Sequence, residues 1–276
     1  MINLFNLENR VAIITGGAGL LGVKHAEAIA EIGGIPIMVD INEEKVESEA
    51  QIIRDTYNVS AIGIKCDITK IEEVKNLLCK IINDFGQVDI LINNAAIDPK
   101  VETKVTKKNS SRLENFIVNN WDKEFEVGVT GAFICTQIIG SHMAECEKGV
   151  IINIGSDLSF IAPNQSIYHQ NENYYDRPVK PVSYSIIKHS LLGLSKYFSI
   201  LWASKGVRIN VLAPSGVWNN KLTDEFVDKI TQKIPMGKMA GIDDYKGSIQ
   251  FLCSDASSYM TGANLLVDGG RTTGVF

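Results

Sequence analysis

The chain has 276 residues, of which 45% are hydrophobic, and its formal net charge is −5 at pH 7. This size suits one large α/β domain over residues 1–276, and the lack of a basic block argues against a nucleic-acid partner. The five scattered cysteines contain no Cys-x-x-Cys pair and the four histidines show no metal-ligand spacing, so we expect reduced thiols, a cytoplasmic protein and no metal. The sequence starts without the features of a signal peptide, and no apolar run approaches the ~20 residues of a membrane span, so we expect no membrane partner.

Short apolar runs alternate with longer amphipathic stretches along the chain. Because the apolar runs are continuous and lie between predicted helices, they indicate a parallel sheet covered on both faces, in a doubly wound α/β fold. Thr69 is predicted to be the N-cap of the helix that follows it. The predicted strands span residues 11–14, 35–40, 61–65, 90–93, 150–154, 207–212 and 264–267, and the predicted helices span residues 19–32, 43–56, 70–84, about 118–145, 184–204, roughly 222–234 and 242–254.

Two stretches interrupt this alternation and are predicted to be inserted loops. A charged stretch covers about residues 98–117, and a polar stretch rich in Tyr and Asn covers about residues 163–182. Hydroxyls, amides and aromatic rings in the second stretch suit a polyhydroxylated substrate. Within it we predict that Tyr174, Tyr175 and Arg177 contact the substrate, with Arg177 binding an anionic group such as a phosphate. The alternative is a surface or subunit-contact loop.

A glycine-rich turn joins the first predicted strand to the first predicted helix. Gly16 allows the tight turn, Gly19 lets the backbone approach a pyrophosphate, and Gly22 permits close packing of the helix on the strand. The N-terminus of the helix then faces the phosphates of a dinucleotide. The alternative is a tight strand–helix turn that binds no ligand.

Asp40 ends the second predicted strand, 18 residues after Gly22. A carboxylate at this place can accept hydrogen bonds from the ribose hydroxyls of an adenosine, and it repels a 2′-phosphate. Since the glycine turn also contains no lysine or arginine, the sequence predicts NAD in preference to NADP. The alternative is that Asp40 only caps the next helix.

Tyr184 and Lys188 lie four residues apart in a predicted helix, so their side chains share one face. A lysine ammonium beside a phenol favours the phenolate, which lets the tyrosine transfer a proton near neutral pH. Together with a dinucleotide site, this pair predicts hydride transfer between a nicotinamide and an alcohol or ketone. The alternative is an exposed pair without a catalytic role.

The chain resembles the short-chain dehydrogenase/reductase family over about residues 8–270. Seven markers occur in the family's order: the glycine turn, Asp67, Asn93-Asn94-Ala95-Ala96, Ser156, the Tyr184/Lys188 pair, Pro214 and Asp268-Gly269-Gly270. The resemblance implies a three-layer Rossmann-type fold with a seven-stranded parallel sheet in the order 3-2-1-4-5-6-7. It also implies an NAD-dependent oxidoreductase.

The resemblance assigns roles to most of these markers. Tyr184 would be the general acid/base, Lys188 would hold the nicotinamide ribose and lower the pKa of Tyr184, and Ser156 would hydrogen-bond the substrate oxygen. A serine after a strand is often only a cap, and Asp67 could merely begin the next helix. The residues implied in cofactor binding, besides Tyr184 and Lys188, are Gly16, Gly19, Leu21, Gly22, Asp40, Ile41, Asp67, Ile68, Asn94, Ala95, Pro214 and Val217.

Two of the chain's departures from the family pattern bear on its function. The spacing of Gly16, Gly19 and Gly22 resembles the family's longer branch, which contains nucleotide-sugar epimerases and dehydratases. An epimerase or dehydratase that retains NAD is therefore an alternative function. Gly128 stands where the shorter branch has an asparagine of its proton relay, so a water or another residue must complete the relay. This departure motivates a third reading, a non-catalytic NAD-binding protein.

The pattern is most similar to oxidoreductases of bacterial flagellin-glycan and sialic-acid-like sugar pathways, on residues 127–133 and 254–262. This resemblance implies interconversion of a secondary alcohol and a ketone on a sugar, or on a phosphorylated or nucleotide-activated sugar. Relatives pair the helices at about 118–145 and 184–204 across two-fold axes, so a homotetramer is expected.

Overall fold

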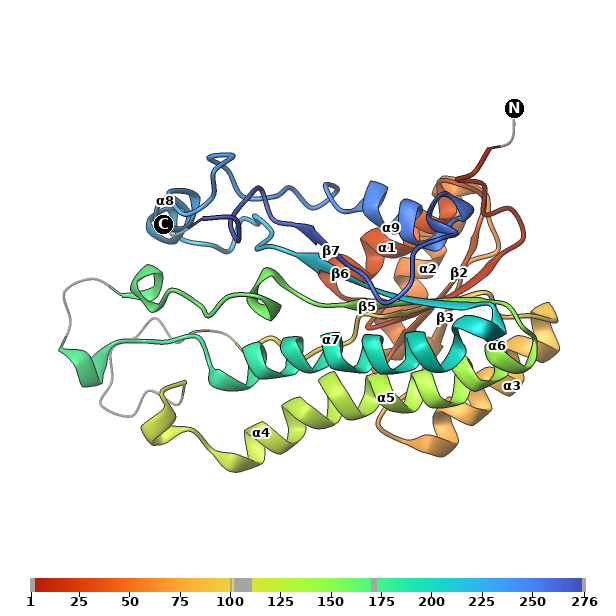
Figure 1. The fold of residues 1–276 in the computed structure, drawn as a ribbon, viewed down its shortest axis with the longest axis horizontal. Helices are drawn as coiled ribbons and strands as arrows, with labels where there is room; N and C mark the ends of the chain where they lie inside the picture. The colour runs from red at the N-terminus through yellow and green to blue at the C-terminus, as the bar shows by residue number, and fades with distance from the viewer. Residues whose placement is uncertain (1–2, 100, 102–110, 170–172, 275–276) are drawn as a thin grey trace.

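A computed structural model describes residues 3–99, 101, 111–169 and 173–274. Figure 1 shows a central sheet with helices on both sides. Each predicted strand and helix is present, with ends that move by a few residues. The strands are β1 (Val11–Thr15), β2 (Ile35–Asp40), β3 (Ile62–Lys65), β4 (Ile90–Asn93), β5 (Gly149–Ile154), β6 (Val207–Pro214) and β7 (Asn264–Val267). The α-helices are α1 (Leu20–Ala30), α2 (Glu43–Tyr57), α3 (Ile71–Phe85), α4 (Val118–Phe125), α5 (Ala132–Cys135), α6 (Ser141–Glu145), α7 (Val182–Trp202), α8 (Asp224–Thr231) and α9 (Lys246–Cys253).

The strands form one parallel sheet in the order β3-β2-β1-β4-β5-β6-β7, which confirms the predicted order. The chain order reverses between β1 and β4, where Ile13 pairs with Leu91. Open α/β sheets bind their ligands at such a switch point, beyond the carboxyl ends of the strands. The glycine turn after β1 and the Asn94-Ala95 segment after β4 both lie at this edge.

The two faces of the sheet bury separate hydrophobic clusters, because side chains alternate along each strand. In β1, Ala12 and Ile14 join a cluster with residues of α1, α2 and α9. Val11 and Ile13 join a second cluster with residues of α3, α5 and α7. Figure 1 shows the same division, with α1, α2 and α9 on one side of the sheet and α3, α5 and α7 on the other. This is the predicted three-layer arrangement.

One continuous helical stretch covers residues 118–145, as predicted, but its hydrogen-bond pattern changes along its length. The segments Glu126–Gly131 and Thr136–Gly140, which separate α4, α5 and α6, are π-helical. By length and composition alone the stretch could span a membrane. Half of its most apolar window is buried inside the protein, where it packs on the sheet, so the core accounts for its apolar character. Polar residues divide this stretch, so its sequence contains no long uninterrupted apolar run.

The start of α3 differs from the prediction. Thr69 is not the N-cap, since α3 begins at Ile71 and Lys70 precedes it. The backbone amide and the hydroxyl of Thr69 both donate to Oδ1 of Asp67, at 3.0 and 2.7 Å. The Thr69 side chain is therefore held by the preceding turn and does not cap the helix.

A chain of buried amides and hydroxyls joins α7 to the centre of the sheet. Asn93 Nδ2 donates to Thr136 Oγ1 at 3.0 Å and to Asn153 Oδ1 at 2.8 Å. Asn153 Nδ2 in turn donates to Ser195 Oγ at 2.8 Å. Leaving one such buried group unpaired would cost about 1–3 kcal/mol, so this network favours one position of α7. The predicted catalytic pair is thereby fixed relative to β4 and β5.

Candidate active site

The glycine turn brings the end of β1 against the start of α1. Gly16 has a φ of 63°, a left-handed conformation that favours glycine. A Cβ atom on Gly22 would lie 2.1 Å from the carbonyl oxygen of Gly16, so a larger residue would push α1 away from the turn. Gly22 therefore permits the close helix–strand packing that a dinucleotide turn requires.

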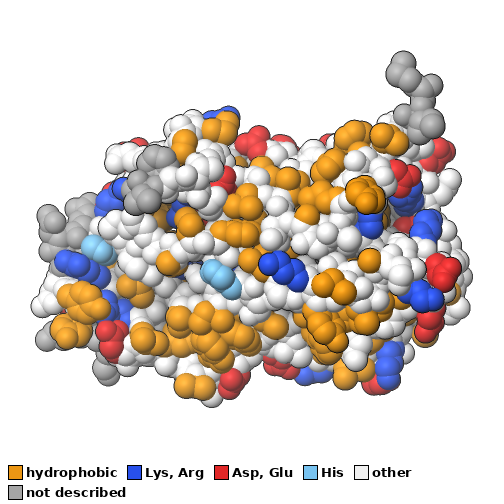
Figure 2. Space-filling view, in the orientation of Figure 1, with side chains coloured by type: hydrophobic (Ala, Val, Ile, Leu, Met, Phe, Trp, Pro, Cys, Tyr) orange, Lys and Arg blue, Asp and Glu red, His pale blue; other side chains and the backbone are white. Residues whose placement is uncertain are grey.

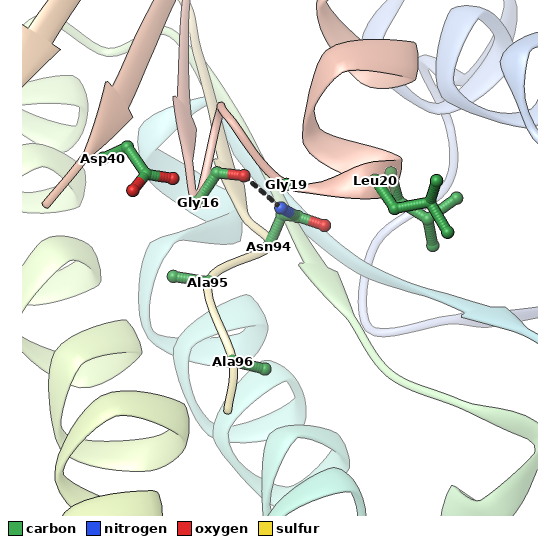
Figure 3. A pocket seen from close by; sticks show the side chains of 8 residues that line it. Gly16, Gly19, Leu20, Asp40, Asn94, Ala95 and Ala96 are labelled. Atoms are coloured by element: carbon green, nitrogen blue, oxygen red, sulfur yellow. Dashed lines mark hydrogen bonds between the residues drawn. The ribbon is translucent and has the colours of Figure 1, made fainter. Parts of the chain in front are cut away.

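A cavity of about 240 Å³ lies at this turn. Figure 3 shows that its walls come from the turn, the end of β2 and the segment after β4. Gly19 is the N-cap of α1 and has no side chain that could bond the first helical amides, so these amides remain available to an anion. The shape and these donors fit the pyrophosphate of a dinucleotide. The lining residues are Gly16, Gly19, Leu20, Leu21, Asp40, Asn94, Ala95 and Ala96.

Asp40 reaches this cavity from the end of β2. Its Oδ2 accepts from the Ala18 amide at 3.2 Å, and its Oδ1 accepts from the Asn42 amide at 3.1 Å. The N-cap of α2 is Asn42, whose side chain accepts from the Lys45 amide, so Asp40 does not cap that helix. The carboxylate thus connects the glycine turn to β2 and places negative charge at the cavity wall.

Thr15 and Asn94 fasten the segment after β4 to the glycine turn. Asn94 Nδ2 donates to the carbonyl oxygens of Thr15 and Gly16 at 2.9 and 3.1 Å, the latter drawn in Figure 3. The Thr15 hydroxyl accepts from the amides of Asn94 and Ala95 at 3.0 and 3.1 Å. The sequence analysis did not single out Thr15, although a hydroxyl at the end of an apolar strand before a glycine turn is a usable signal.

The other residues implied in cofactor binding lie outside the lining of this cavity, as far as the described part of the chain shows. Ile41 is 68% exposed after β2, whereas Ile68 is buried in the core. Pro214 ends β6, and Val217 forms an isolated parallel bridge with Ala240. Their contacts with a cofactor, and those of Asp67, stay predictions.

Tyr184 lies in the first turn of α7, next to the residues that follow β5. Burial raises the pKa of its phenol, and the charges of Asp98 and Asp157 raise it further. The nearby Ser156 side chain acts on this pKa in the opposite direction. The structure thus brings Ser156 and Tyr184 together, although 28 positions separate them in the sequence.

Lys188 follows Tyr184 on the same face of α7. Its side chain is buried, and its Nζ atom donates to the carbonyl oxygen of Ile154 at 2.7 Å. Nζ lies 5.8 Å from the centroid of the Tyr184 ring. Burial lowers the pKa of Lys188 to about 8, although the charge of Asp98 opposes this effect. The pair is therefore not the exposed helical pair of the plainer alternative.

Residues 18–272 match the family profile described as enoyl-(acyl carrier protein) reductase. The chain belongs to the short-chain dehydrogenase/reductase family. It is therefore an NAD(P)-dependent oxidoreductase that interconverts an alcohol and a ketone.

Relatives of the family align over nearly the whole chain. The NAD-dependent glycerol dehydrogenase of Listeria innocua is 28% identical, covering 97% of this chain and 96% of its own. The NADP-dependent mannitol dehydrogenase of Alternaria alternata is 30% identical, covering 97% of this chain and 94% of its own. A gluconate 5-dehydrogenase from Burkholderia cenocepacia, crystallised with NADP and tartrate, superposes with a TM-score of 0.85 at 28% identity, covering 99% and 98% of the two chains.

Gly128, where this short-chain dehydrogenase lacks the family's relay asparagine, packs against α7. A Cβ atom on Gly128 would lie 2.6 Å from Cγ2 of Ile187. Ile187 therefore fills the space that an asparagine side chain would need. The position also falls within the π-helical segment Glu126–Gly131. In this chain Ile187 of the neighbouring helix thus leaves no room for a larger side chain at position 128.

Ser156 is held by a buried acidic network that the sequence analysis missed. Its hydroxyl donates to Oδ1 of Asp157 at 2.8 Å and accepts from the Leu158 amide at 3.1 Å. Oδ2 of Asp157 accepts from Ser215 Oγ at 2.7 Å and from Arg271 at 2.6 Å. Ser156 also caps the short 3₁₀ helix Asp157–Ser159, so its capping role and its place beside Tyr184 coexist.

Two further charged residues near Tyr184 were also missed. Lys180 Nζ lies 4.1 Å from the centroid of the Tyr184 ring, and it pairs with Oδ1 of Asp98 at 2.5 Å. Both residues fall inside the stretches predicted to be inserted loops. Lys180 lies four residues before Tyr184 in the sequence, but within a polar stretch that is typical of a loop.

The predicted substrate residues gather around Arg112. The guanidinium of Arg112 lies 4.8 Å from the ring centroid of Tyr174 and 6.0 Å from that of Tyr175. It also donates to the carbonyl oxygens of Tyr174 and Arg177, at 2.8 and 3.2 Å. The two predicted loops therefore contact one another. Their residues 100, 102–110 and 170–172 lie outside the described residues, and the substrate roles of Tyr174, Tyr175 and Arg177 stay predictions.

Proposed function

We propose that this enzyme oxidises a secondary hydroxyl of a sugar alcohol or sugar derivative, reversibly and with NAD as the preferred cofactor. The observation that carries the proposal is the group of buried Ser156, half-buried Tyr184 and buried Lys188, at the sheet edge that also holds the glycine-turn cavity. Polyols and a sugar acid are the substrates named for the three relatives described above, and each is polyhydroxylated.

Tyr184 is the proposed general acid/base. During oxidation its ionised phenol accepts the hydroxyl proton of the substrate, and during reduction the phenol returns it. Ser156 hydrogen-bonds the substrate oxygen beside Tyr184. Its hydroxyl is oriented by Asp157 and by the Leu158 amide. Lys188 holds the ribose of the cofactor and supplies positive charge to the site. The cofactor, when bound by the glycine turn, supplies the hydride acceptor or donor.

The preference for NAD rests on Asp40. Its carboxylate lines the cavity and is fixed by two backbone amides. A 2′-phosphate beside it would be repelled by at least about 1–2 kcal/mol at an effective dielectric constant near 20. The relatives include both NAD- and NADP-dependent enzymes, so the residues of this chain carry the argument.

The finer substrate assignment also remains part of the proposal. A phosphorylated or nucleotide-activated sugar, and a place in flagellin-glycan or sialic-acid-like sugar pathways, rest on the sequence resemblance alone. The relatives favour an unactivated polyol or sugar acid. Cytoplasmic localisation is likewise a prediction from the scattered cysteines.

A homotetramer is the proposed assembly. Figure 2 shows hydrophobic side chains gathered along the lower part of the face on which α4, α5 and α7 lie in Figure 1. Val118 of α4 is 69% exposed, and Tyr197 and Ile200 of α7 are 68% and 84% exposed. Apolar patches of this kind are typical of subunit interfaces. Light scattering at micromolar concentration tests it, since a mass near the 30.3 kDa of one chain would contradict the proposal.

The test of the function is turnover of polyols, sugar acids and activated sugars with NAD, by wild type and by Tyr184→Phe. Wild type should accumulate NADH with at least one of them, and Tyr184→Phe should lower turnover at least ~100-fold with NAD affinity retained. Product formed without net NADH would favour the epimerase or dehydratase alternative. NAD binding without turnover of any substrate would favour the non-catalytic alternative. Near-normal turnover by Tyr184→Phe would refute the proposed role of the tyrosine.

A further inference from the structure

Lys180 places a second ammonium group on the ring of Tyr184. Its Nζ atom is 4.1 Å from the ring centroid, whereas Nζ of Lys188 is 5.8 Å away. A cation within about 6 Å of an aromatic centroid is attracted by the ring's electrons. The attraction grows when the phenol ionises, because the negative charge spreads over the ring. Lys180 is thus placed to favour the ionised form of Tyr184.

Two contacts hold Lys180 in this position. Its Nζ atom pairs with Oδ1 of Asp98, which follows β4, at 2.5 Å. Its backbone amide donates to Oε1 of Gln165 at 2.8 Å. The side chain of Lys180 is only 12% exposed, whereas that of Asp98 is 67% exposed. The ammonium is therefore shielded from water on the Tyr184 side and tethered at the rim of the site.

Other charges around Tyr184 leave a need for such a cation. Burial and two carboxylates raise the pKa of the phenol. Lys188 donates a hydrogen bond to the Ile154 carbonyl oxygen. Burial lowers the pKa of Lys188 to about 8; the charge of Asp98 opposes this effect and the charge of Lys180 adds to it, so the positive charge of Lys188 declines through the alkaline range. The groups that face Tyr184 or its turn of α7 are Lys180 and Lys188, Asp98 after β4, Asp157 and its partner Arg271, Tyr168, and Glu124 of α4 through Ser183.

We propose that Lys180 is a positioning residue for Tyr184, held over the ring by Asp98, and that it supports ionisation of the phenol in addition to Lys188. The inference rests on the proposed role of Tyr184 as the general acid/base. Lys180 lies in the polar stretch before α7, so this stretch contributes to the chemistry as well as to the predicted substrate contacts.

The experiment measures the ionisation of Tyr184 directly and turnover separately. Protein labelled with ¹³Cζ-tyrosine gives one resonance per tyrosine, and the Tyr184 resonance is the one missing from Tyr184→Phe. Wild type, Lys180→Met and Lys180→Arg are compared at one alkaline pH at which circular dichroism shows each to be folded. Lys196→Met is the matched control, because Lys196 is an exposed lysine of α7, the helix that carries Tyr184. The pH dependence of kcat/KM for polyol oxidation is recorded on the same proteins.

Lys180→Met should lower the ratio of phenolate to phenol at Tyr184 about tenfold, a pKa increase of about one unit. Its kcat/KM near neutral pH should fall by a similar factor and recover as the pH rises. Lys180→Arg and Lys196→Met should both resemble wild type. If Lys180→Met does not fold, Lys180→Gln takes the same measurement.

A Tyr184 resonance that shows the same ratio of phenolate to phenol in wild type and in the neutral variants would overturn the inference. The proposed function has a separate failure, which is near-normal turnover by Tyr184→Phe. In that case the resonance of Tyr184 still reports whether Lys180 controls its ionisation, so the two failures are distinguishable.

Discussion

Replacing Gly22 by alanine tests how closely α1 must approach the glycine turn. The added Cβ would lie 2.1 Å from the Gly16 carbonyl oxygen and 2.9 Å from Gly17 Cα, far inside the 3.4 Å at which ordinary contact begins. Both neighbours are backbone atoms, so no side-chain rotation relieves the overlap. Overpacking of this kind costs about 1–3 kcal/mol, which exceeds the ~0.5–1 kcal/mol that alanine gains over glycine within a helix.

The overlap should also weaken cofactor binding, because α1 must move away from the turn whose amides face the pyrophosphate. We expect Gly22→Ala to lower the melting temperature and to weaken NAD binding at least about tenfold, the equivalent of 1.4 kcal/mol. Thermal unfolding by circular dichroism and titration calorimetry with NAD measure the two effects.

Gly193→Ala is the matched control. Gly193 lies in the middle of α7, and among the described residues a Cβ atom there would meet nothing within 4 Å apart from its chain neighbours and the backbone of its own helix. This variant should therefore gain about 0.5–1 kcal/mol of stability and bind NAD as wild type does. If Gly22→Ala instead matched Gly193→Ala in both measurements, the close packing inferred at the turn would be wrong.

Three other variants probe the remaining charged groups. Asp40→Asn keeps an acceptor for the Ala18 amide but removes the charge, so the ratio of NADP to NAD dissociation constants should fall about tenfold in binding titrations. An unchanged ratio would contradict the role of the Asp40 carboxylate in cofactor preference. Arg271→Met strands the buried Asp157 carboxylate and should cost about 3–5 kcal/mol in urea unfolding, a loss that adding Asp157→Asn should partly restore. Burial lowers the pKa of His25 to about 3 in the folded chain, whereas it is ~6.5 in the unfolded chain. The stability that depends on the neutral imidazole is therefore complete above pH ~6.5 and is lost as the pH falls towards 3. His25→Gln should therefore flatten the decline in unfolding free energy between about pH 6.5 and 4; parallel declines would refute this.

Strand and helix positions were predictable because their signals are local. Apolar runs such as residues 90–93 and 264–267 coincide with strands, since both faces of a parallel sheet are covered. Helix ends were less predictable where side chains compete for the same amides. At Thr69 the carboxylate of Asp67 took the hydroxyl that was expected to cap α3.

The candidate site divides in the same way. The glycine turn and the Tyr184/Lys188 spacing were visible because each lies within a few residues. The partner of Asp157 was not, because Arg271 is 114 positions away and no local pattern connects them. Lys180 lies only four residues before Tyr184, but the direction of its side chain depends on Asp98, which belongs to the distant segment after β4. The space at Gly128 likewise depends on Ile187 of a neighbouring helix.

The Asp157–Arg271 ion pair has a consequence for the order in which the site is completed. Closing a segment of 114 positions is entropically slower than forming the local turn that lines the cofactor cavity. The cavity draws only on residues up to Ala96, whereas the orientation of Ser156 depends on a side chain beyond β7. The orientation of Ser156 therefore requires the chain beyond β7, whereas the lining of the cofactor cavity does not.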